Sequence, residues 1–142
     1  MNVYAGGCLC GAVRFSVAGP LREILVCHCG ECRRWSGRAW PATAASRDDL
    51  TIVRGEIRWC PSPGSTSSAR RGSCSVCGSC LFWDAPGRDT VSISACSLDD
   101  ASSLRVAAHI YVAHGVPWDV PPAGMTAYAG AYPESAPALR RH

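Results

Sequence analysis

The chain has 142 residues, of which 47% are hydrophobic and 18% are charged, and its formal net charge is +3 at pH 7. This composition is enough for one domain with a buried core, and it excludes a wholly disordered protein. All 14 basic residues are arginine, and a charge of +3 is too weak by itself to indicate nucleic-acid binding. No apolar run reaches the roughly eighteen residues of a membrane span. The opening stretch Met1–Ala5 lacks the basic start and apolar core of a signal peptide, so we expect a cytoplasmic protein.

Short segments of β type follow one another along the chain. The stretch Ala12–Val17 alternates apolar and polar residues, the period of a half-buried strand. Further strands are expected at 40–44, 50–54, 57–60, 80–84, 90–95 and 108–112, separated by Gly, Pro, Asp and Ser. One or two helical turns are expected after Cys29, a turn near 97–100 and a loop over 61–68. The prediction is a mainly β, antiparallel fold with little helix. It is expected to form one domain over residues 1–135, with a loose tail over 136–142.

Ten cysteines are the outlying feature of the composition, and seven of them fall in three tight clusters: Cys8-Leu9-Cys10, Cys27-His28-Cys29-Gly30-Glu31-Cys32 and Cys74-Ser75-Val76-Cys77. A disulfide needs Cα atoms about 5.5 Å apart and suitable side-chain directions. Closely spaced cysteines meet these conditions poorly, but they offer several thiolates to one cation. The clusters therefore favour metal binding over disulfides or separate buried thiols.

The first and third clusters together predict a closed metal site. Cys8 and Cys10 lie two apart, so in an extended chain their side chains point to the same face. Cys74 and Cys77 form a C-x-x-C loop followed by Gly78, which is free to adopt a positive φ. Four thiolates in tetrahedral geometry make a structural zinc site.

The second cluster offers three thiolates, from Cys27, Cys29 and Cys32. Three protein ligands and one open position are typical of catalytic zinc. His28 lies between two of these cysteines, so its ring is expected to point away from the metal. The alternative is that a distant fourth ligand closes the site, with Cys60, Cys80, Cys96 and His109 as candidates. Cys80 could also compete for either metal or be an ordinary core residue.

The same residues resemble a known family. Gly7-Cys8-Leu9-Cys10-Gly11, the cluster at 27–32 with Ser36-Gly37, and Cys74-Ser75-Val76-Cys77-Gly78-Ser79 with Leu81-Phe82-Trp83 are similar to motifs of the glutathione-dependent formaldehyde-activating enzymes, also called the GFA or CENP-V family. The later stretches Leu98-Asp99-Asp100, His109-Ile110-Tyr111-Val112 and Pro117-Trp118 agree, so the resemblance extends from residue 4 to about residue 132.

The resemblance implies a β-tent fold with two zinc ions. It implies a structural zinc on Cys8, Cys10, Cys74 and Cys77, and a catalytic zinc on Cys27, Cys29 and Cys32. It also implies a carbon–sulfur lyase activity that forms S-hydroxymethylglutathione from glutathione and formaldehyde. Fold and family alone do not secure an activity.

Candidate substrate contacts lie just after the second cluster. Arg33 and Arg34 could pair with the carboxylates of glutathione, and Ser36 could donate a hydrogen bond. Trp35 and Trp40 could line a pocket or pack in the core. His109 is expected to be a hydrogen-bonded core histidine, and Asp99 and Asp100 are expected to cap a turn.

Two other readings remain open. In the first, both zinc ions only hold loops in place, and the pairs Arg70-Arg71 and Arg140-Arg141 recruit a protein or nucleic-acid partner. No basic stripe with interleaved aromatics supports nucleic acid, and two thiolate-bound zinc ions would bring the net charge from +3 to about 0. In the second, the spare cysteines serve a redox or metal-buffering role. The favoured partner is a small thiol, and no membrane partner is expected.

Overall fold

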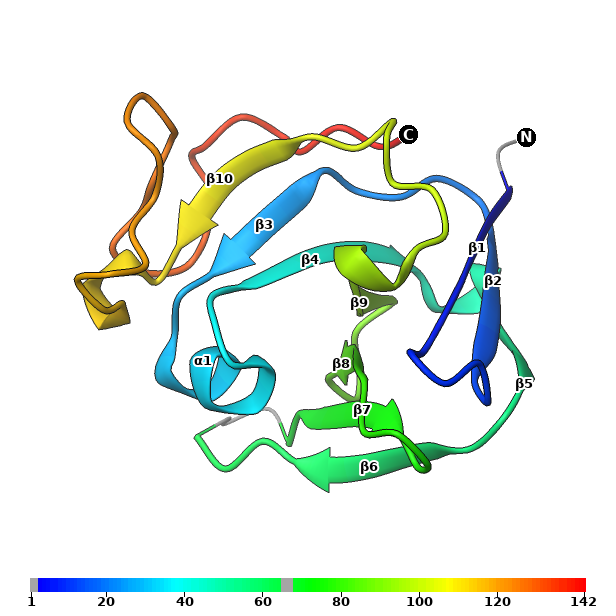
Figure 1. The fold of residues 1–142 in the computed structure, drawn as a ribbon. Coiled ribbons are helices and arrows are strands. Elements are labelled where there is room, and N and C mark those ends of the chain that lie inside the picture. Colours follow the sequence, from blue (N-terminus) through cyan, green and yellow to red (C-terminus); the bar gives the residue numbers. More distant parts are fainter. Residues whose placement is uncertain (1–2, 65–67) are drawn as a thin grey trace.

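Short strands, one helix and three single-turn 3₁₀ segments make up the described chain (Figure 1). The structure is a computed structural model that describes residues 3–64 and 68–142. Its strands are β1 (Val3–Gly7), β2 (Arg14–Ala18), β3 (Ile24–Cys27), β4 (Trp40–Ser46), β5 (Leu50–Arg54), β6 (Ile57–Pro61), β7 (Arg70–Cys74), β8 (Cys80–Asp84), β9 (Thr90–Ser94) and β10 (Val106–Ile110). The helix is α1 (Gly30–Ser36), and the 3₁₀ segments are η1 (Arg47–Asp49), η2 (Ala95–Ser97) and η3 (Val112–His114). In these ranges no helix has the length and apolar character needed to span a bilayer.

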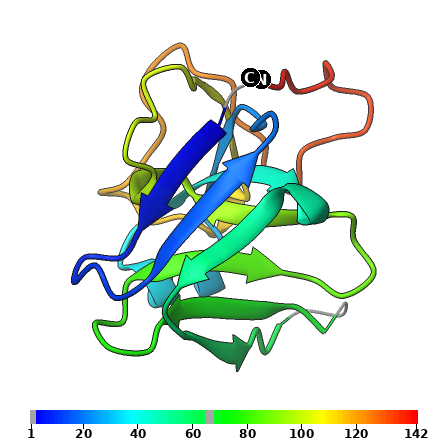
Figure 2. The same cartoon turned by 90° about the vertical axis from the view of Figure 1, so that its right-hand side faces the viewer.

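Two open sheets organise the described strands. The small sheet has the order β1-β2-β5, and the large one has the order β10-β3-β4-β9-β8-β7-β6. The pairs are antiparallel except β10–β3, which is parallel. In Figure 2 the small sheet faces the viewer, with strands of the large sheet behind it and below it. The predicted fold class, mainly β and antiparallel with little helix, is confirmed.

The predicted strands agree with most of the observed ones. The ranges 50–54 and 80–84 coincide with β5 and β8, and the predictions for β2, β4, β6, β9 and β10 hold with ends displaced by at most two residues. The strands β1, β3 and β7 were not predicted. β1 and β7 contain glycine, which weakens the local preference for a strand, so pairing with neighbours decides their conformation. The loop expected over 61–68 begins with Pro61 at the end of β6, and residues 65–67 lie outside the described chain.

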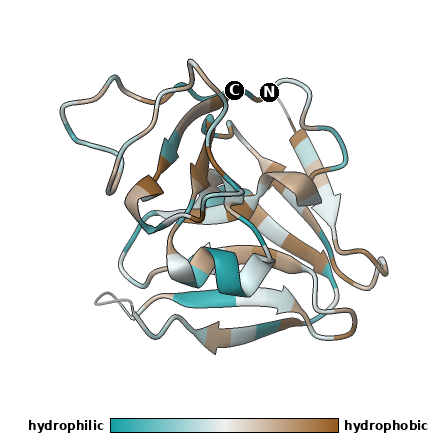
Figure 3. Cartoon of the chain, turned by 60° about the vertical axis from the view of Figure 1, so that its left-hand side comes forward, coloured by the Kyte–Doolittle hydropathy of each residue, from teal (hydrophilic) through white to brown (hydrophobic). Residues whose placement is uncertain are grey.

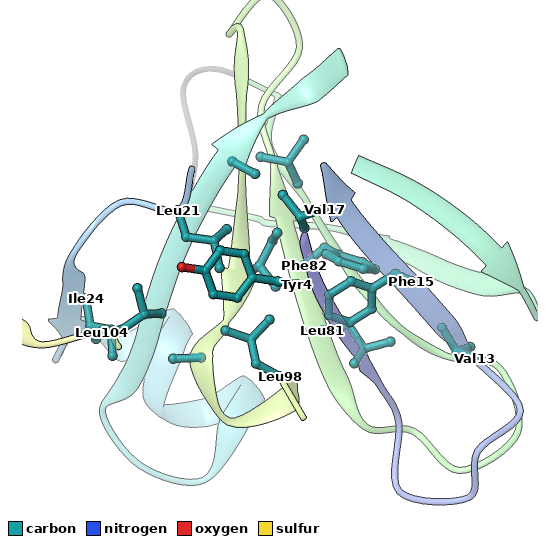
Figure 4. Close-up of a cluster of buried hydrophobic side chains, with 14 of the residues drawn as sticks. Tyr4, Val13, Phe15, Val17, Leu21, Ile24, Leu81, Phe82, Leu98 and Leu104 are labelled. Carbon is teal, nitrogen blue, oxygen red and sulfur yellow. The ribbon is translucent and has the colours of Figure 1, made fainter. Parts of the chain in front are cut away.

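The main core fills the space between the two sheets (Figure 4). Alternate residues of β1 and β2 point inward, so Tyr4, Phe15 and Val17 are buried. The large sheet contributes Leu81 and Phe82, and the ring of Phe82 meets that of Phe15 edge to face, with centroids 5.3 Å apart. This core fixes the small sheet against the strands that carry the third cysteine cluster.

The helix α1 begins at a cysteine cap. The Sγ atom of Cys29 accepts a hydrogen bond from the backbone N–H of Cys32, and Glu31 lies in the first turn, where a negative charge is favourable. The helix ends when the N–H of Gly37 donates to the carbonyl of Arg33 at 2.8 Å. Figure 3 shows hydrophilic segments on the α1 ribbon. Within the helix, Arg34 is exposed and Cys32 is buried. The helical turn predicted after Cys29 is therefore confirmed.

The C-terminal residues form backbone hydrogen bonds with the segment around Leu21. The backbones of Leu21 and His142 exchange two hydrogen bonds of 2.6 and 2.7 Å, and the N–H of Glu23 donates to the carbonyl of Arg140. The segment 136–142, expected to be loose, thus has ordered backbone partners at its end.

Candidate metal centres

Four sulfur atoms converge where the hairpin of the small sheet meets the β7–β8 loop. Cys8 and Cys10 follow β1, Cys74 ends β7, and Cys77 precedes β8. Their Sγ atoms lie within 4.8 Å of one another, with 3.6 Å between Cys8 and Cys10 and 3.9 Å between Cys10 and Cys74. A tetrahedral ion about 2.3 Å from each sulfur requires sulfur–sulfur distances of about 3.8 Å. The donor set therefore fits a single four-coordinate thiophilic ion.

Backbone amides around this four-cysteine cluster point at its sulfurs. The N–H of Val13 donates to Cys8 Sγ at 3.2 Å, and the N–H groups of Val76 and Cys77 donate to Cys74 Sγ at 3.4 Å. Gly78 closes the loop with a φ of 77°, a conformation that a side chain would strain. The hydroxyl of Ser79 bonds to Cys77 Sγ and lowers the pKa of that thiol to about 5. These contacts stabilise thiolates, the form that binds metal.

The second cluster brings together three sulfurs from a strand end and a helix start. Cys27 ends β3, Cys29 caps α1 and Cys32 lies within the helix, and their Sγ atoms lie within 4.8 Å of one another. Among residues 3–64 and 68–142, no other histidine, cysteine or acidic side chain joins this group. The residues considered as a distant fourth ligand, namely Cys60, Cys80, Cys96 and His109, therefore stay outside it.

The three thiols of the second cluster differ in acidity. Hydrogen bonds from Cys27 and Cys32, with help from the charge of Arg71, lower the pKa of Cys29 to about 2. Hydrogen bonding to the Cys29 thiolate raises the pKa of Cys27, which therefore holds its proton. At Cys32, the bond with Cys27 lowers the pKa. The bond with Cys29 and burial raise it by more, so the pKa of this thiol rises to about 11. Binding of a cation by all three sulfurs would release the remaining protons.

His28 points away from the three sulfurs, as predicted. Its ring is buried and its Nε2 atom lies 2.8 Å from Nδ1 of His109 on β10. The expectation that His109 is a hydrogen-bonded core histidine is confirmed. The nearby carboxylate of Asp119 accepts bonds from Arg38 Nη2 at 2.6 Å and from the N–H of Ala39 at 3.0 Å.

A cavity of about 1150 Å³ is lined by residues of the four-cysteine cluster and of the segments around α1, but not by Cys27, Cys29 or Cys32 themselves. Cys8 and Cys77 line it on the side of the four-cysteine cluster, and His28, Ser36 and Trp40 line it on the side of α1. Trp40 also belongs to a small apolar cluster with Cys32 and Ala42, against which Cys27, Cys29 and Trp35 pack. Trp40 is therefore common to the cavity wall and to the cluster that contains the three sulfurs.

The predicted substrate residues take different positions around α1. Ser36 lines the cavity, where its hydroxyl donates to the carbonyls of Cys32 and Arg38. Arg33 and Arg34 are not among the residues that line the cavity. Arg33 Nε donates to the carbonyl of His114 at 3.3 Å, and Arg34 is exposed.

Of the two aspartates expected to cap a turn, Asp100 bonds to a nearby backbone N–H and Asp99 pairs with an arginine. Asp100 accepts from the N–H of Ser102 at 2.9 Å, the geometry of a turn cap. Asp99 instead forms a bidentate pair with Arg14, and both line the cavity.

Sequence reasoning missed Arg71 as a neighbour of the second cluster. Its Nη1 atom lies 3.6 Å from Cys32 Sγ, and its side chain is buried. The pair Arg70-Arg71 was considered only as surface charge. The alternation of side chains along a strand could have indicated this position. Two adjacent residues of β7 point to opposite faces, so Arg70 and Arg71 cannot both lie on the same surface.

Comparison with known proteins places the chain in a family. The family model described as "Glutathione-dependent formaldehyde-activating enzyme" matches residues 3–114. A Halomonas elongata protein named "Putative glutathione-dependent formaldehyde-activating enzyme" is 37% identical over 83 residues, which cover 54% of this chain and 53% of that protein. The chain thus matches about half the length of this relative.

A solved structure supports the fold. A crystal structure of a Rhodobacter sphaeroides protein aligns with a TM-score of 0.56 at 22% identity and covers 87% of this chain and 98% of that one. At this identity the similarity concerns the fold only. Since the family model matches most of the chain, the protein belongs to the glutathione-dependent formaldehyde-activating enzyme family.

Proposed function

We propose that the protein is a carbon–sulfur lyase that joins a thiol, glutathione or a close analogue, to a small aldehyde such as formaldehyde. In this reaction a sulfur–carbon bond forms, the carbonyl π bond breaks, and the thiol proton ends on the new hydroxyl. The observation that carries the proposal is a set of three convergent sulfurs without a fourth side-chain ligand in the described chain, in an apolar cluster whose Trp40 lines a cavity of about 1150 Å³. Family membership supports the choice of thiol and aldehyde.

The donor sets support two zinc ions with different tasks. A closed set of four thiolates suits a structural ion that ties the small sheet to the β7–β8 loop. A zinc ion on Cys27, Cys29 and Cys32 would supply Lewis acidity toward the carbonyl and favour the deprotonated form of a thiol. Both sites belong to a single zinc domain that we assign to residues 1–135.

The residues around the second cluster would position the substrate. Trp40 presents an apolar surface next to the sulfurs, and Ser36 contributes a hydroxyl at the cavity wall. Arg34 is exposed, and among the described residues Arg33 bonds through Nε to the carbonyl of His114, so both guanidinium groups offer further donors to the carboxylates of glutathione. Arg33 and Arg34 directly follow Cys32 on α1.

The alternative function is a non-catalytic, zinc-stabilised module that binds a protein or nucleic acid. Its first basic pair is not an open patch, because Arg71 is buried and Arg70 pairs with Asp84 at 3.0 Å. This arrangement favours the enzyme over the binding module.

Exchange spectroscopy tests the proposal, because glutathione and formaldehyde interconvert with their adduct at a measurable rate. The wild-type protein is expected to accelerate the exchange, and Cys29→Ser is expected to abolish the acceleration. Cys60→Ser serves as the matched control, since Cys60 is exposed and lies outside both clusters. An exchange rate that the wild type leaves unchanged would refute this substrate pair.

Metal content provides a second test. The purified protein is expected to carry close to two zinc ions, and a mild chelator is expected to remove one of them while the circular dichroism spectrum persists. If neither ion can be removed without unfolding, the three-sulfur site is closed and the binding-module alternative gains support.

A further inference from the structure

Arg71 is a buried cation next to the second cysteine cluster. Strand β7 alternates its faces, so Arg70 points outward with 44% of its side chain exposed, whereas Arg71 points inward and is 7% exposed. The Nη1 atom of Arg71 lies 3.6 Å from the sulfur of Cys32. A strand far along the chain from α1 thus delivers a positive charge to one of the three sulfurs.

Groups from two other elements fix the orientation of the Arg71 guanidinium. Its Nε atom donates to the hydroxyl of Ser62 at 3.0 Å, and that hydroxyl donates to a carboxylate oxygen of Glu31 on α1. The guanidinium carbon also lies 5.1 Å from the ring centroid of Trp35, within reach of a cation–π interaction. Because Glu31, Cys32 and Trp35 all belong to α1, these contacts hold the guanidinium against the helix that carries the third sulfur.

Among the described residues no carboxylate pairs directly with this guanidinium, and Glu31 is linked to it only through the hydroxyl of Ser62. In the described chain Arg14, Arg38, Arg47 and Arg70 each pair with an aspartate within 4.0 Å, but Arg71 has no such partner. A buried charge without a partner is costly, so a negative group is expected nearby. Three thiolates and one divalent cation sum to −1, which the charge of Arg71 offsets.

We propose that Arg71 is the counter-charge of the three-cysteine site. It positions Cys32 as a metal ligand, and it offsets the negative charge that a bound thiolate adds to the cluster. The second part rests on the proposed function, because it assumes a thiol substrate. Arg71 is a positioning residue, since its contact is with a ligand sulfur. Outer contacts of this kind typically change metal affinity by roughly 10- to 100-fold.

Zinc competition with a chromophoric chelator tests the first part on the whole protein. Arg71→Gln is expected to weaken retention of the more weakly held zinc about tenfold or more, and Arg71→Lys, which keeps the charge, is expected to recover much of that loss. The matched control is Arg70→Gln, which removes the charge of the adjacent residue on the other face and should leave both zinc affinities unchanged. The more tightly held zinc serves as an internal reference in every variant.

The outcomes separate charge from packing. A Lys variant that loses zinc as readily as the Gln variant, or a Gln variant that retains zinc like wild type, would overturn the proposal. If Arg71→Gln does not fold, Arg71→Lys against wild type still decides, because retention within about threefold supports the charge role and a loss of tenfold or more contradicts it. Zinc retention requires no turnover, so this result stands whether or not the protein accelerates glutathione–formaldehyde exchange.

Glutathione affinity tests the second part of the proposal, the offset of a bound thiolate's charge. It should weaken at least fivefold in Arg71→Gln relative to Arg70→Gln, and equal affinities would remove that part.

Discussion

The Nε2 atom of His28 lies 2.8 Å from the Nδ1 atom of His109, and both rings are buried. His28 separates two cysteines of the second cluster, and His109 belongs to β10, the strand that pairs in parallel with β3. The backbone N–H of His28 also donates to the carbonyl of Ile110 at 2.9 Å. The segment that carries Cys27 and Cys29 is therefore anchored to β10 through both a side chain and a backbone bond.

Removal of this side-chain bond should destabilise the protein. His109→Leu leaves the Nε2 atom of His28 buried without its partner, which is expected to lower the free energy of unfolding by about 1–3 kcal/mol. Urea denaturation measures the change. The matched control is His114→Leu, whose side chain is exposed and which should change the unfolding free energy by less than about 0.5 kcal/mol. Equal effects of the two variants would mean that the His28–His109 bond adds no stability.

The same pair predicts a pH dependence. Burial, and then the neighbouring His28, lower the pKa of His109 below its ordinary value of 6.5, while Asp119 opposes this shift. In this range the unfolded state binds more protons, so the stability due to the neutral imidazole is complete above about pH 6.5 and is lost as the pH falls below it. The unfolding free energy of the wild type should thus fall more steeply than that of His109→Leu between pH 6.5 and 5.5. Parallel curves would contradict the assignment.

The two cysteine clusters should respond differently to serine. Cys8→Ser removes a ligand from the set that joins the β1–β2 hairpin to the β7–β8 loop, so a loss comparable with the whole stability of a small domain, roughly 5 kcal/mol or more, is expected. In Cys29→Ser the serine hydroxyl can replace the sulfur as the acceptor of the helix cap, and the altered cluster is confined to residues 27–32, so the melting temperature should stay near that of the wild type. Thermal unfolding together with zinc content measures both. The reverse order would exchange the structural and catalytic assignments.

The three cysteine clusters can be recognised in the sequence because their members lie close together along the chain. The structure brings Cys8 and Cys10 together with Cys74 and Cys77, and it gathers Cys27, Cys29 and Cys32, so each of the two groups could hold a metal ion. Several predicted strands, such as β2, β5 and β9, contain alternating or β-branched residues, but β3, with the sequence ILVC, contains β-branched residues too and was not predicted. β1, which ends in two glycines, and β7, with the sequence RRGSC, show no such pattern, and their conformation depends on their partners in the sheets.

The surroundings of the second cluster could not be predicted in the same way. Arg71, Ser62 and Glu31 come from β7, the loop after β6 and α1, and they meet only because the large sheet places these elements together. Cys80 shows the same limit, since its sulfur donates to the carbonyl of Trp35 at 3.3 Å and does not join either cluster. Contacts between distant segments depend on topology, which spacing along the chain does not encode.

Gly55 is expected to be intolerant of a side chain. It joins β5 to β6 with a φ of 89°, and a Cβ atom there would lie 2.3 Å from the carbonyl oxygen of Ala12, next to the loop of Cys8 and Cys10. Gly55→Ala should therefore lower the unfolding free energy by roughly 3 kcal/mol or more, through backbone strain plus a clash with the backbone. Gly124→Ala isolates the strain, because Gly124 has a φ of 83° with open space around it, and should cost only about 1 kcal/mol. Equal losses would show that the contact with Ala12 relaxes freely.

The packing of Trp40, which lines the cavity and belongs to the apolar cluster of the three cysteines, can be tested by substitution. The residue is 4% exposed, and its Nε1 atom has no hydrogen-bond partner among the described residues. A buried donor without an acceptor is unfavourable, so Trp40→Phe, which keeps an aromatic ring and removes the N–H, should leave the unfolding free energy within about 1 kcal/mol of the wild type. Trp40→Ala instead removes the ring whose centroid lies 5.0 Å from that of Trp35. This variant should lower the unfolding free energy by about 3–5 kcal/mol. Denaturant titrations of both variants give the comparison. A loss in Trp40→Phe as large as that in Trp40→Ala would mean that the indole N–H is bonded in solution, and the Trp40 side chain would then be held by a polar contact as well as by packing.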